Sequence, residues 1–440
     1  MGANNSENLS RIKLRQWRQF DEIDIEFHPR LTVLTGANGT GKSTILSILE
    51  SNLIGGERGN YLATPVENES KKETRYSVST IFQRFNPFRK SPNEAVEQFE
   101  PQQIGSVVFN GFETCNLSLP PPQKIEYTLM FSRHPELAGF KIGSHRPVPK
   151  YQSVRDIPVA GIKPMEAFEY FKQSWSNYEV SQVLRRGSSH IKNPISPLKQ
   201  TLISFAMHGS NNKNVRAVPE IVGLFDEFQS TLKNILPKEI RFKRLQVSPP
   251  EVLVITETGD FPIDGSSGGL MSLIQTSWQI FLFTHANKGP CVVLIDEPEN
   301  HLHPSLQREY LSLIVNAFRS VQFVVVTHSP FIISSVKDCV VYALRFKQLL
   351  NEDDVQSGPH AVISERIDLN NNAVTAAEIL DEVLGVSVTM PVWAEQKLRD
   401  IVDNFNKDSL DEMAMEKMRA DLRVEGLGDF LPQAITRLLK

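Results

Sequence analysis

The sequence predicts an α/β fold built on a mostly parallel sheet, and three stretches support this prediction. Residues 31–34 form a short apolar run that leads into a glycine-rich loop and then a helix-like pattern. Residues 292–295 and 322–326 form two further apolar runs, and each stops at polar side chains. Short continuous apolar runs are typical of buried parallel strands, and ligands bind where such strands end. We therefore expect a site at the carboxyl ends of these strands.

Residues 11–27 (RIKLRQWRQFDEIDIEF) alternate loosely between apolar and polar side chains. This alternation predicts two short paired strands at the start of the chain. Trp17 and Phe20 lie in this stretch, and they could either stack on an adenine ring or fill the core of the sheet. The core interpretation is favoured, because aromatic side chains are more often simple sheet residues.

The glycine-rich loop has the spacing Gly36-x-x-x-x-Gly41-Lys42-Ser43, which is the P-loop pattern in its required strand–loop–helix context. Glycines let successive backbone N–H groups point into one concavity, and the helix N-terminus adds its positive end. Lys42 can reach the β- and γ-phosphates of a nucleotide, and the Ser43 hydroxyl can hold Mg²⁺. The candidate binding residues are Gly36, Asn38, Gly39, Gly41, Lys42, Ser43 and Thr44.

Residues 291–304 (CVVLIDEPENHLHP) place two acids at the end of the second apolar run. Asp296 is expected to hold Mg²⁺, which prefers oxygen ligands, and Glu297 to orient and activate the attacking water. His301 and His303 could be zinc ligands, but no third ligand with suitable spacing is near. A turn that enters the next helix is therefore favoured for the two histidines.

The third apolar run ends in the sequence THSP, which places His328 directly after a strand. A histidine in this position, next to a P-loop site, can reach the γ-phosphate of a bound nucleotide. We therefore expect His328 to take part in the site rather than to fill the core.

Three motifs together resemble the ATP-binding-cassette (ABC) class of P-loop ATPases, in its RecF, SMC and OLD-nuclease branch: GANGTGKS (36–43), VVLIDEPENHLHP (292–304) and VVVTHSP (324–330). The resemblance implies an ABC ATPase head, with a mostly parallel sheet, flanking helices and antiparallel N-terminal strands. It further implies that ATP and Mg²⁺ bind, and that hydrolysis depends on Lys42, Glu297 and His328.

The resemblance also implies a signature loop, for which residues 264–270 (DGSSGGL) are the candidate. They match the class at Ser266 and Gly268. They differ at Gly265, where leucine is usual, and at Gly269, where an acid or glutamine is usual. In this class the loop completes the site of a second chain, so the resemblance implies a homodimer or a higher even oligomer around ATP.

Two more positions follow from the same class. Gln83 ends a strand-like stretch and is the candidate Q-loop residue, which in the class contacts Mg²⁺ and the attacking water. Glu299 and Asn300 fall in the D-loop, which in the class crosses the dimer interface.

Lys42 and Asp296 are far apart in the sequence, so an insertion is expected between the two halves of the site. The expected organisation is a first part of the ATPase head (1–86), a basic mixed or helical insertion (87–240), a second part of the head (241–345) and an acidic helical C-terminal extension (346–440).

Charge is unevenly distributed along the chain, although the net charge is only -4. Residues 124–250 contain 19 Lys and Arg against 10 Asp and Glu, whereas residues 351–440 contain 9 against 18. The basic region could bind nucleic acid through its phosphates or form a solvated face. Its clusters are Arg185, Arg186, Lys192 and Lys199, and then Lys238, Arg241, Lys243 and Arg244.

The composition is that of an ordinary globular protein, with 40% hydrophobic and 22% charged residues. No apolar run approaches the length of a membrane helix. Cys115, Cys291 and Cys339 are widely spaced, which argues against a zinc ribbon or a disulfide framework. We expect a reduced, cytoplasmic protein without a membrane partner.

Among ABC-class proteins, the length and motifs look like the stand-alone ATPase subunits of bacterial anti-phage systems, of the Septu PtuA-like and retron-associated kinds. That resemblance implies an ATPase that regulates a separate nuclease. The leading alternative is a RecF-like ATPase of DNA repair that binds DNA itself. A transporter's nucleotide-binding subunit and a non-catalytic nucleotide sensor are further alternatives.

Overall fold

The computed structural model divides the chain into two units, Met1–Ala376 and Ala377–Lys440. Within the described residues, unit 1 contains the sheets and helices α1 to α7, and unit 2 contains helices α9 and α10. The structure describes residues 8–68, 73–77, 102–110, 114–120, 125–133, 137–146, 151–154, 156–158, 160–183, 193–211, 216–347, 361–367, 392–405, 412–431, 434–435 and 438.

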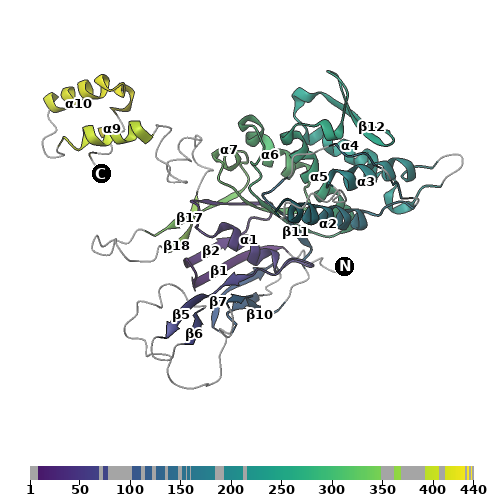
Figure 1. Ribbon diagram of the computed structural model, residues 1–440, viewed down its shortest axis with the longest axis horizontal. Helices are drawn as coiled ribbons and strands as arrows, with labels where there is room; N and C mark the ends of the chain where they lie inside the picture. Colours follow the sequence, from purple (N-terminus) through teal and green to yellow (C-terminus); the bar gives the residue numbers. More distant parts are fainter. Residues whose placement is uncertain are drawn as a thin grey trace. The chain divides into compact units, whose positions relative to one another are not determined.

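Unit 1 is organised around a mixed sheet whose described strands run in the order β10-β8-β7-β1-β2-β18-β17-β3-β16-β15-β11 (Figure 1). The run from β17 to β11 is parallel throughout, whereas the strands from β10 to β2 pair antiparallel. The bounds are β1 Leu9–Trp17, β2 Phe20–Glu26, β3 Leu31–Gly36, β7 Gln103–Phe109, β8 Thr114–Ser118, β10 Met130–Phe131, β11 Gly139–Ile142, β15 Cys291–Asp296, β16 Val321–Val326, β17 Val340–Phe346 and β18 Val362–Ile367. The predicted α/β fold is confirmed.

The register of the parallel strands brings three loops to one edge of the sheet. Val326 at the end of β16 pairs with Leu34 of β3 on one side and with Asp296 of β15 on the other. All three strands are buried along their whole length, which explains their continuous apolar runs. The glycine-rich loop, the acid pair and the histidine loop therefore leave the sheet next to one another.

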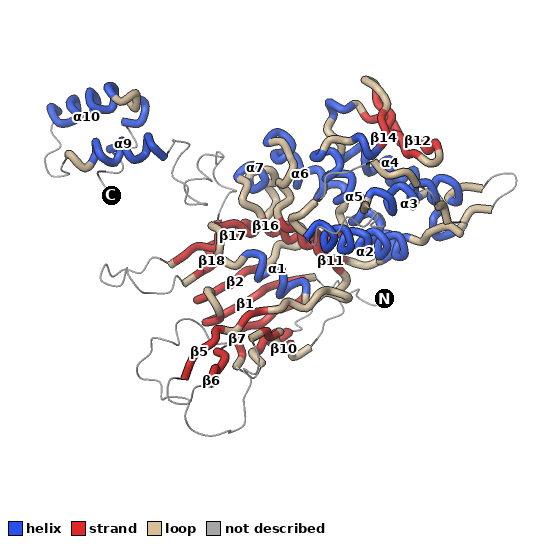
Figure 2. The backbone as a smooth tube through the Cα atoms, in the orientation of Figure 1, coloured by secondary structure: helices blue, strands red, loops and turns tan. Residues whose placement is uncertain are grey.

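Helices gather near the β11 end of the sheet, while β7 and β10 lie at the opposite end (Figures 1 and 2). A small sheet of β12 (Phe242–Ser248), β13 (Glu251–Thr256) and β14 (Phe261–Pro262) accompanies them. The helices are α1 Lys42–Glu50, α2 Pro164–Val183, α3 Ile195–His208, α4 Leu224–Ile235, α5 Gly268–Ala286, α6 Pro304–Ala317 and α7 Pro330–Ile333, with short 3₁₀ turns η2 Pro219–Ile221, η3 Lys238–Ile240 and η4 Ile263–Gly265. The described part of unit 1 also holds two short strand pairs, β4 (Tyr61–Leu62) with β9 (Glu126–Tyr127) and β5 (Thr64–Asn68) with β6 (Glu73–Ser77).

The sheet extends beyond the expected limits of the ATPase head. β7, β8, β10 and β11 come from the stretch expected to be an insertion, yet they belong to the main sheet. β18 comes from the expected C-terminal extension, and it pairs with β2 and β17. Several of these strands are short or only partly apolar, so their sequence pattern resembles that of a loop.

Trp17 and Phe20 face each other across the β1–β2 hairpin, and both side chains are fully buried. The Trp17 indole Nε1 donates a hydrogen bond of 3.1 Å to the Tyr127 hydroxyl. Neither ring is accessible to a nucleotide base, so the core interpretation is confirmed.

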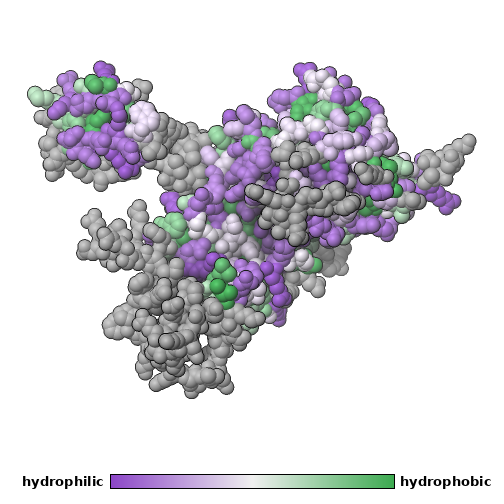
Figure 3. Space-filling view, in the orientation of Figure 1, coloured by the Kyte–Doolittle hydropathy of each residue, from purple (hydrophilic) through white to green (hydrophobic). Residues whose placement is uncertain are grey.

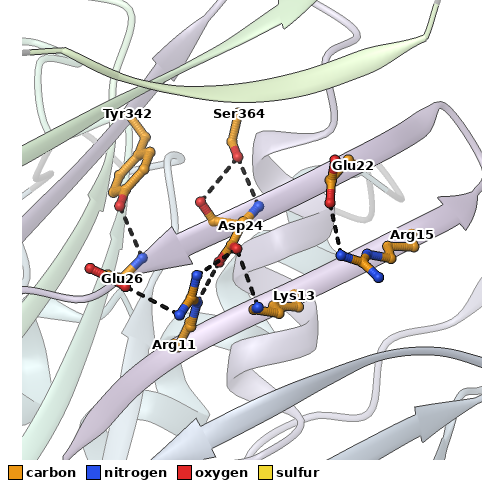
Figure 4. Close-up of polar contacts among 8 residues, drawn as sticks. All are labelled: Arg11, Lys13, Arg15, Glu22, Asp24, Glu26, Tyr342 and Ser364. Carbon is orange, nitrogen blue, oxygen red and sulfur yellow. Dashed lines mark hydrogen bonds and ion pairs between the residues drawn. The ribbon is translucent and has the colours of Figure 1, made fainter.

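Side chains of β17 and β18 hold β2 where the backbone pairing between β2 and β18 stops (Figure 4). β2 pairs with β18 only at its start, as far as Ile363. Beyond that point the Asp24 N–H donates to the Ser364 hydroxyl at 2.8 Å, and the Glu26 N–H donates to the Tyr342 hydroxyl at 3.0 Å. On the β1 side, the Arg11 guanidinium makes two hydrogen bonds to the Asp24 carboxylate. Burial by itself would raise the pKa of Asp24, but the bonds from Arg11 outweigh it and lower the pKa.

Gln322 joins the start of β1 to β16. Its buried side-chain amide donates to the carbonyls of Leu9 (2.8 Å) and His28 (3.1 Å), and its Oε1 accepts from the Leu9 N–H at 2.9 Å. Three backbone groups thus depend on this one side chain.

Gln322→Leu is expected to lower the free energy of unfolding by about 3 kcal/mol, because the buried backbone groups lose their partners and stay out of water. Urea unfolding of the full chain, followed by tryptophan fluorescence, measures the loss. Gln103→Leu, on the exposed side of β7, is the matched control and should change stability by less than about 0.5 kcal/mol. Equal effects of the two changes would contradict the role given to Gln322.

Unit 2 is helical within its described residues. It contains α9 (Val392–Val402), α10 (Glu412–Val424) and the short turn η8 (Gly428–Phe430). Leu398 and Val402 from α9 are buried with Met418 and Leu422 from α10 in a small apolar cluster of their own.

Among the described residues, no helix is both long and apolar enough to cross a membrane. Hydrophilic residues cover most of the described part of the face in Figure 3, and hydrophobic residues form only scattered patches on it.

Candidate nucleotide-binding site

The glycine-rich loop connects β3 to α1 and requires glycine at two positions. Gly36 has φ of 137°, and a Cβ there would lie 2.2 Å from the Leu344 carbonyl oxygen. Gly41 has φ of 90°, and a Cβ there would lie 2.4 Å from both the Gln19 and the Phe20 side chains. Any larger residue would have to adopt a left-handed backbone and move its neighbours. The spacing of the motif therefore reflects local packing as well as phosphate binding.

Lys42, the first residue of α1, folds back over the loop. Its Nζ donates to the carbonyl oxygens of Gly36 (2.9 Å) and Ala37 (2.8 Å). Burial lowers the pKa of the ammonium group to about 8, and the nearby acids Asp296, Glu297 and Glu299 oppose this only in part. The ammonium group is held over the mouth of the loop, where a phosphate can replace its carbonyl partners.

Nucleotide binding is expected to raise the pKa of Lys42, because a phosphate brings negative charge next to the ammonium group. Binding of Mg-free ATP at pH 8 should therefore take up as much as about half a proton, and almost none at pH 6.5, where Lys42 is already charged. Isothermal titration calorimetry in two buffers of different ionisation enthalpy measures the uptake.

Lys42→Arg is the control for this measurement, since arginine stays protonated at both pH values. Proton uptake by the variant at pH 8 equal to that of the wild type would assign the proton to another group.

Asp296 ends β15 with one side-chain oxygen unpaired. The residue is 9% exposed, and its Oδ1 has no hydrogen-bond partner among the described residues. Burial raises the pKa of this carboxyl group, while Lys141 and Lys42 act in the opposite direction. A buried carboxylate oxygen without a partner is suited to a hard cation. Together with the exposed hydroxyl of Ser43, Asp296 provides the oxygen ligands that Mg²⁺ needs, so the residues present fit this metal.

Glu297 follows with a left-handed backbone, at φ of 45°, which is uncommon for a residue other than glycine. Its N–H donates to the Val326 carbonyl at 2.9 Å, which joins the acid loop to β16. The Asn300 side-chain amide donates to Glu297 Oε2 (3.1 Å) and to the Ser144 carbonyl (3.0 Å). The turn of the backbone lets adjacent acids point in different directions, and Asn300 fixes the direction of the second.

Glu299 links the acid loop to the histidine loop of its own chain. Its Oε1 accepts from the His328 N–H at 2.8 Å, and its Oε2 accepts from the Thr327 hydroxyl at 2.8 Å. The carboxylate is thus already used within its own chain, although the resemblance placed it at a dimer interface. Burial, and then the charge of Lys42, lower the pKa of His328. The imidazole is therefore mainly neutral at pH 7 before a nucleotide binds.

The candidate signature loop precedes α5 and shows a difference between its two serines. Ser267 is exposed and caps the helix, with its Oγ accepting from the Leu270 N–H at 3.4 Å. Ser266 is 7% exposed, and its hydroxyl has no partner among the described residues. Ser267 is thus the more exposed of the two, and the phosphate contact expected of Ser266 stays a prediction. Gly268 begins the helix.

Two protein-family profiles match the chain. The one described as "AAA domain, putative AbiEii toxin, Type IV TA system" matches residues 256–334, and the one described as "AAA domain" matches residues 11–113. These two segments contain the P-loop, the candidate signature loop, the acid pair and the histidine loop.

Several curated proteins have related sequences, among them a Septu protein and a retron ATPase. Septu protein PtuA from Bacillus mycoides (strain KBAB4) is 21% identical over 396 residues, which cover 87% of this chain and 45% of that protein. The Retron Vc95 probable ATPase from Vibrio cholerae serotype O1 biovar El Tor is 22% identical over 371 residues, which cover 74% of this chain and 71% of that protein. The chain thus spans less than half the length of the first relative.

Among solved structures, the SMC head domain from Thermotoga maritima matches 82% of this chain and 99% of its own, with 12% identity and a TM-score of 0.41. The two AAA-domain profiles and the two relatives agree with the resemblance drawn from the three sequence motifs.

Other residues singled out in the sequence have different places in the structure. His303 caps α6, with its Nδ1 accepting from the Ser305 N–H at 3.3 Å, and His301 packs beside Gly268 and Gly269. Within the described ranges, no cluster of three or more His, Cys, Asp or Glu side chains could hold a metal ion, and the expected turn at these histidines is confirmed. Gln83 lies outside the described residues, so its role stays a prediction.

Arg146, which contacts the acid loop at the Pro298 carbonyl, was missed by the sequence reasoning. It follows β11, which runs parallel beside β15, and it is 5% exposed. Its Nη1 donates to the Ser272 hydroxyl (2.7 Å) and to the Pro298 carbonyl (3.1 Å), while Nε and Nη2 have no partner among the described residues. Only the pairing of β11 with β15 reveals this position, because β11 is short and far from β15 in the sequence.

Proposed function

We propose that this chain binds and hydrolyses Mg-ATP, dimerises around the nucleotide in the cytoplasm, and regulates a separate effector nuclease in anti-phage defence. The observation that carries the proposal is the unpaired, buried Oδ1 of Asp296 at the sheet edge that also presents Lys42 and His328. This combination of an ammonium group, a metal-binding acid and a histidine is suited to a nucleoside triphosphate.

Each side chain has a separate task in the proposed reaction. Lys42 neutralises charge on the phosphates, and His328 approaches the γ-phosphate as a neutral imidazole that can donate a hydrogen bond. Ser43 and Asp296 would hold Mg²⁺, which neutralises charge that develops during phosphoryl transfer. Glu297 orients the attacking water and accepts its proton, while Asn300 holds the carboxylate in place. Catalysis then rests mainly on positioning and electrostatic stabilisation.

Dimerisation is proposed because the start of α5 presents outward-facing donors. Ser267 is exposed, and the first N–H groups of a helix favour an anion. By the resemblance to the ABC class, this loop would meet the γ-phosphate bound by a second chain. Two ATP molecules would then lie between two chains, and hydrolysis would let the two chains separate.

The effector is proposed from the relatives, since Septu protein PtuA and a retron ATPase both match this chain. The second candidate function, a RecF-like ATPase that binds DNA itself, is favoured by a different observation. Lys238, Arg241, Lys243 and Arg244 are all exposed around the start of β12, and exposed basic clusters bind phosphates.

A plaque assay tests the proposed function. The gene is expressed with its neighbouring reading frame, and phage plating is compared between the wild type and Lys42→Ala. Lys163→Ala, which changes an exposed lysine next to α2, is the control. We expect protection by the wild type and the control, and loss of protection with Lys42→Ala.

Two results would contradict the proposal. The first is protection that persists in Lys42→Ala. The second is salt-sensitive DNA binding by the purified chain alone, with DNA-stimulated ATPase activity and no effect on phage, which would favour the repair function.

A further inference from the structure

Lys199 is a fully buried lysine, although it was expected in a basic surface cluster. It lies in α3, and its side chain is 0% exposed. Its Nζ donates to the Gln152 carbonyl (2.9 Å), to Glu251 Oε2 (2.5 Å) and to Asp264 Oδ2 (2.9 Å). An ammonium group has three N–H donors, so all of them are used. Lys199 is therefore unable to bind a nucleic acid phosphate.

The partners of Lys199 come from three different segments. Gln152 also donates its own N–H to Asp264 Oδ2 at 3.1 Å. Tyr151 donates its hydroxyl to Glu251 Oε1 at 2.9 Å, and the Lys199 Nζ lies 5.2 Å from the centre of the Tyr151 ring. Burial by itself would raise the pKa of Glu251, but the hydrogen bonds from Lys199 and Tyr151 outweigh it and lower the pKa.

Asp264 connects this ion cluster to the candidate signature loop. It lies in η4, and the next residues are Gly265, Ser266 and the helix cap Ser267. The Ser266 N–H donates to the Ile263 carbonyl at 3.2 Å, so the loop starts from the same turn that carries Asp264. A side chain 2% exposed, held by Lys199 and Gln152, leaves this turn little freedom to move.

We propose that Lys199 is a positioning residue for ATP hydrolysis: through Asp264 it holds the signature loop of its chain in the geometry that meets the nucleotide of the partner chain. The inference rests on the proposed function, because it needs a site shared between two chains. It gives α3 a defined task, since movement of that helix would change the position of Ser267. Lys199 acts through Asp264 and does not touch the nucleotide.

Lys199→Met removes the ammonium group and keeps a side chain of similar length. In the homodimer we expect turnover to fall by about 10- to 100-fold, because small displacements of a group near the reacting phosphate have effects of this size. Binding of a fluorescent ATP analogue should stay within about twofold of the wild type, because the P-loop of the variant chain is intact. Lys163→Met, which removes an exposed ion pair with Glu220, is the control and should leave turnover unchanged.

Mixed dimers give the readout that a merely structural role would not produce. Lys199→Met mixed with Lys42→Ala should recover up to about a quarter of wild-type turnover, since half of the dimers are mixed and each holds one intact shared site. Lys199→Met mixed with Ser267→Arg should recover nothing, because both changes damage the signature loop. Recovery with Ser267→Arg and none with Lys42→Ala would mean that Lys199 acts on the P-loop of its own chain, and this result would overturn the proposal.

Asp264→Asn is the second variant, and it carries the test if Lys199→Met does not fold. It keeps the volume of the side chain and leaves Lys199 paired with Glu251, so thermal unfolding should show a folded chain. The same recovery pattern is expected, and full turnover by folded Asp264→Asn, or no recovery with Lys42→Ala, would overturn the proposal. Mixing Lys42→Ala with Ser267→Arg distinguishes failure of the proposed function from failure of the role given to Lys199. If this mixture does not recover turnover, the shared site of the proposed function is wrong.

Discussion

Glu297→Gln is expected to stop ATP turnover while ATP stays bound. The change keeps the size of the side chain and one oxygen that can accept from Asn300, whose amide lies 3.1 Å from Glu297 Oε2. It removes the group that takes a proton from the attacking water. Loss of a general base lowers turnover by about 10²- to 10⁴-fold. Lys42, Ser43 and Asp296 are untouched, so nucleotide affinity should remain.

The trapped state provides the measurement. With Mg-ATP, the variant should elute as a stable dimer that contains about one ATP for each chain, whereas the wild type should return to its starting state as ATP is consumed. Light scattering coupled to gel filtration, with nucleotide analysis of the peak, measures both quantities. Glu309→Gln, an exposed acid on α6, is the matched control. Wild-type turnover by Glu297→Gln would show that another group activates the water.

Mixing two inactive variants is expected to restore activity. Lys42→Ala disables phosphate binding, and Ser267→Arg places a large cation where the partner's γ-phosphate would lie. Each homodimer should turn over ATP at least about 100-fold more slowly than the wild type. In a mixed dimer, one site combines the intact P-loop of one chain with the intact signature loop of the other. Recovery should therefore reach up to about a quarter of wild-type turnover at equal mixing.

Ser267 is chosen for this experiment because its side chain is exposed, whereas Ser266 is buried. Replacing each with alanine tests the choice: Ser267→Ala should lower turnover more than Ser266→Ala. The opposite ranking would return the phosphate contact to Ser266. Failure of Lys42→Ala and Ser267→Arg to recover at any mixing ratio, with subunit exchange demonstrated, would argue for a site contained in one chain.

Much of the nucleotide site is visible in the sequence because each part follows a short apolar run. The loop that carries Lys42 begins at the end of β3, Asp296 is the last residue of β15, and His328 lies two residues after β16. A strand buried on both faces leaves little doubt about where it ends. The order of the strands in the sheet has no such local signal. The strand order depends on pairings between segments far apart in the sequence. For this reason the residues of β11 were assigned to the insertion, and those of β18 to the C-terminal extension, rather than to the ATPase head.

The residues that sequence reasoning missed act through tertiary contacts. Arg146 is near the acid loop only because β11 pairs with β15. Lys199 looks like part of a basic surface when charges are counted. However, its helix is buried from Ile195 to Phe205, and the apolar residues around Lys199 in that stretch are the signal that could have placed it inside. Ser266 is buried and Ser267 is exposed because Ser267 caps α5. A match to a loop pattern does not show which of two adjacent serines is the exposed one.

The position of β18 has a consequence for how the chain is made. This strand lies between β2 and β17, so the last of the described strands to be synthesised occupies the middle of the sheet. Until residues 361–367 leave the ribosome, β2 and β17 each present an unpaired edge, and such edges readily pair with other chains. The nascent protein is thus most exposed to misassembly just before its sheet closes. Protection by a chaperone at that stage would matter more for this chain than for one whose sheet grows from one side.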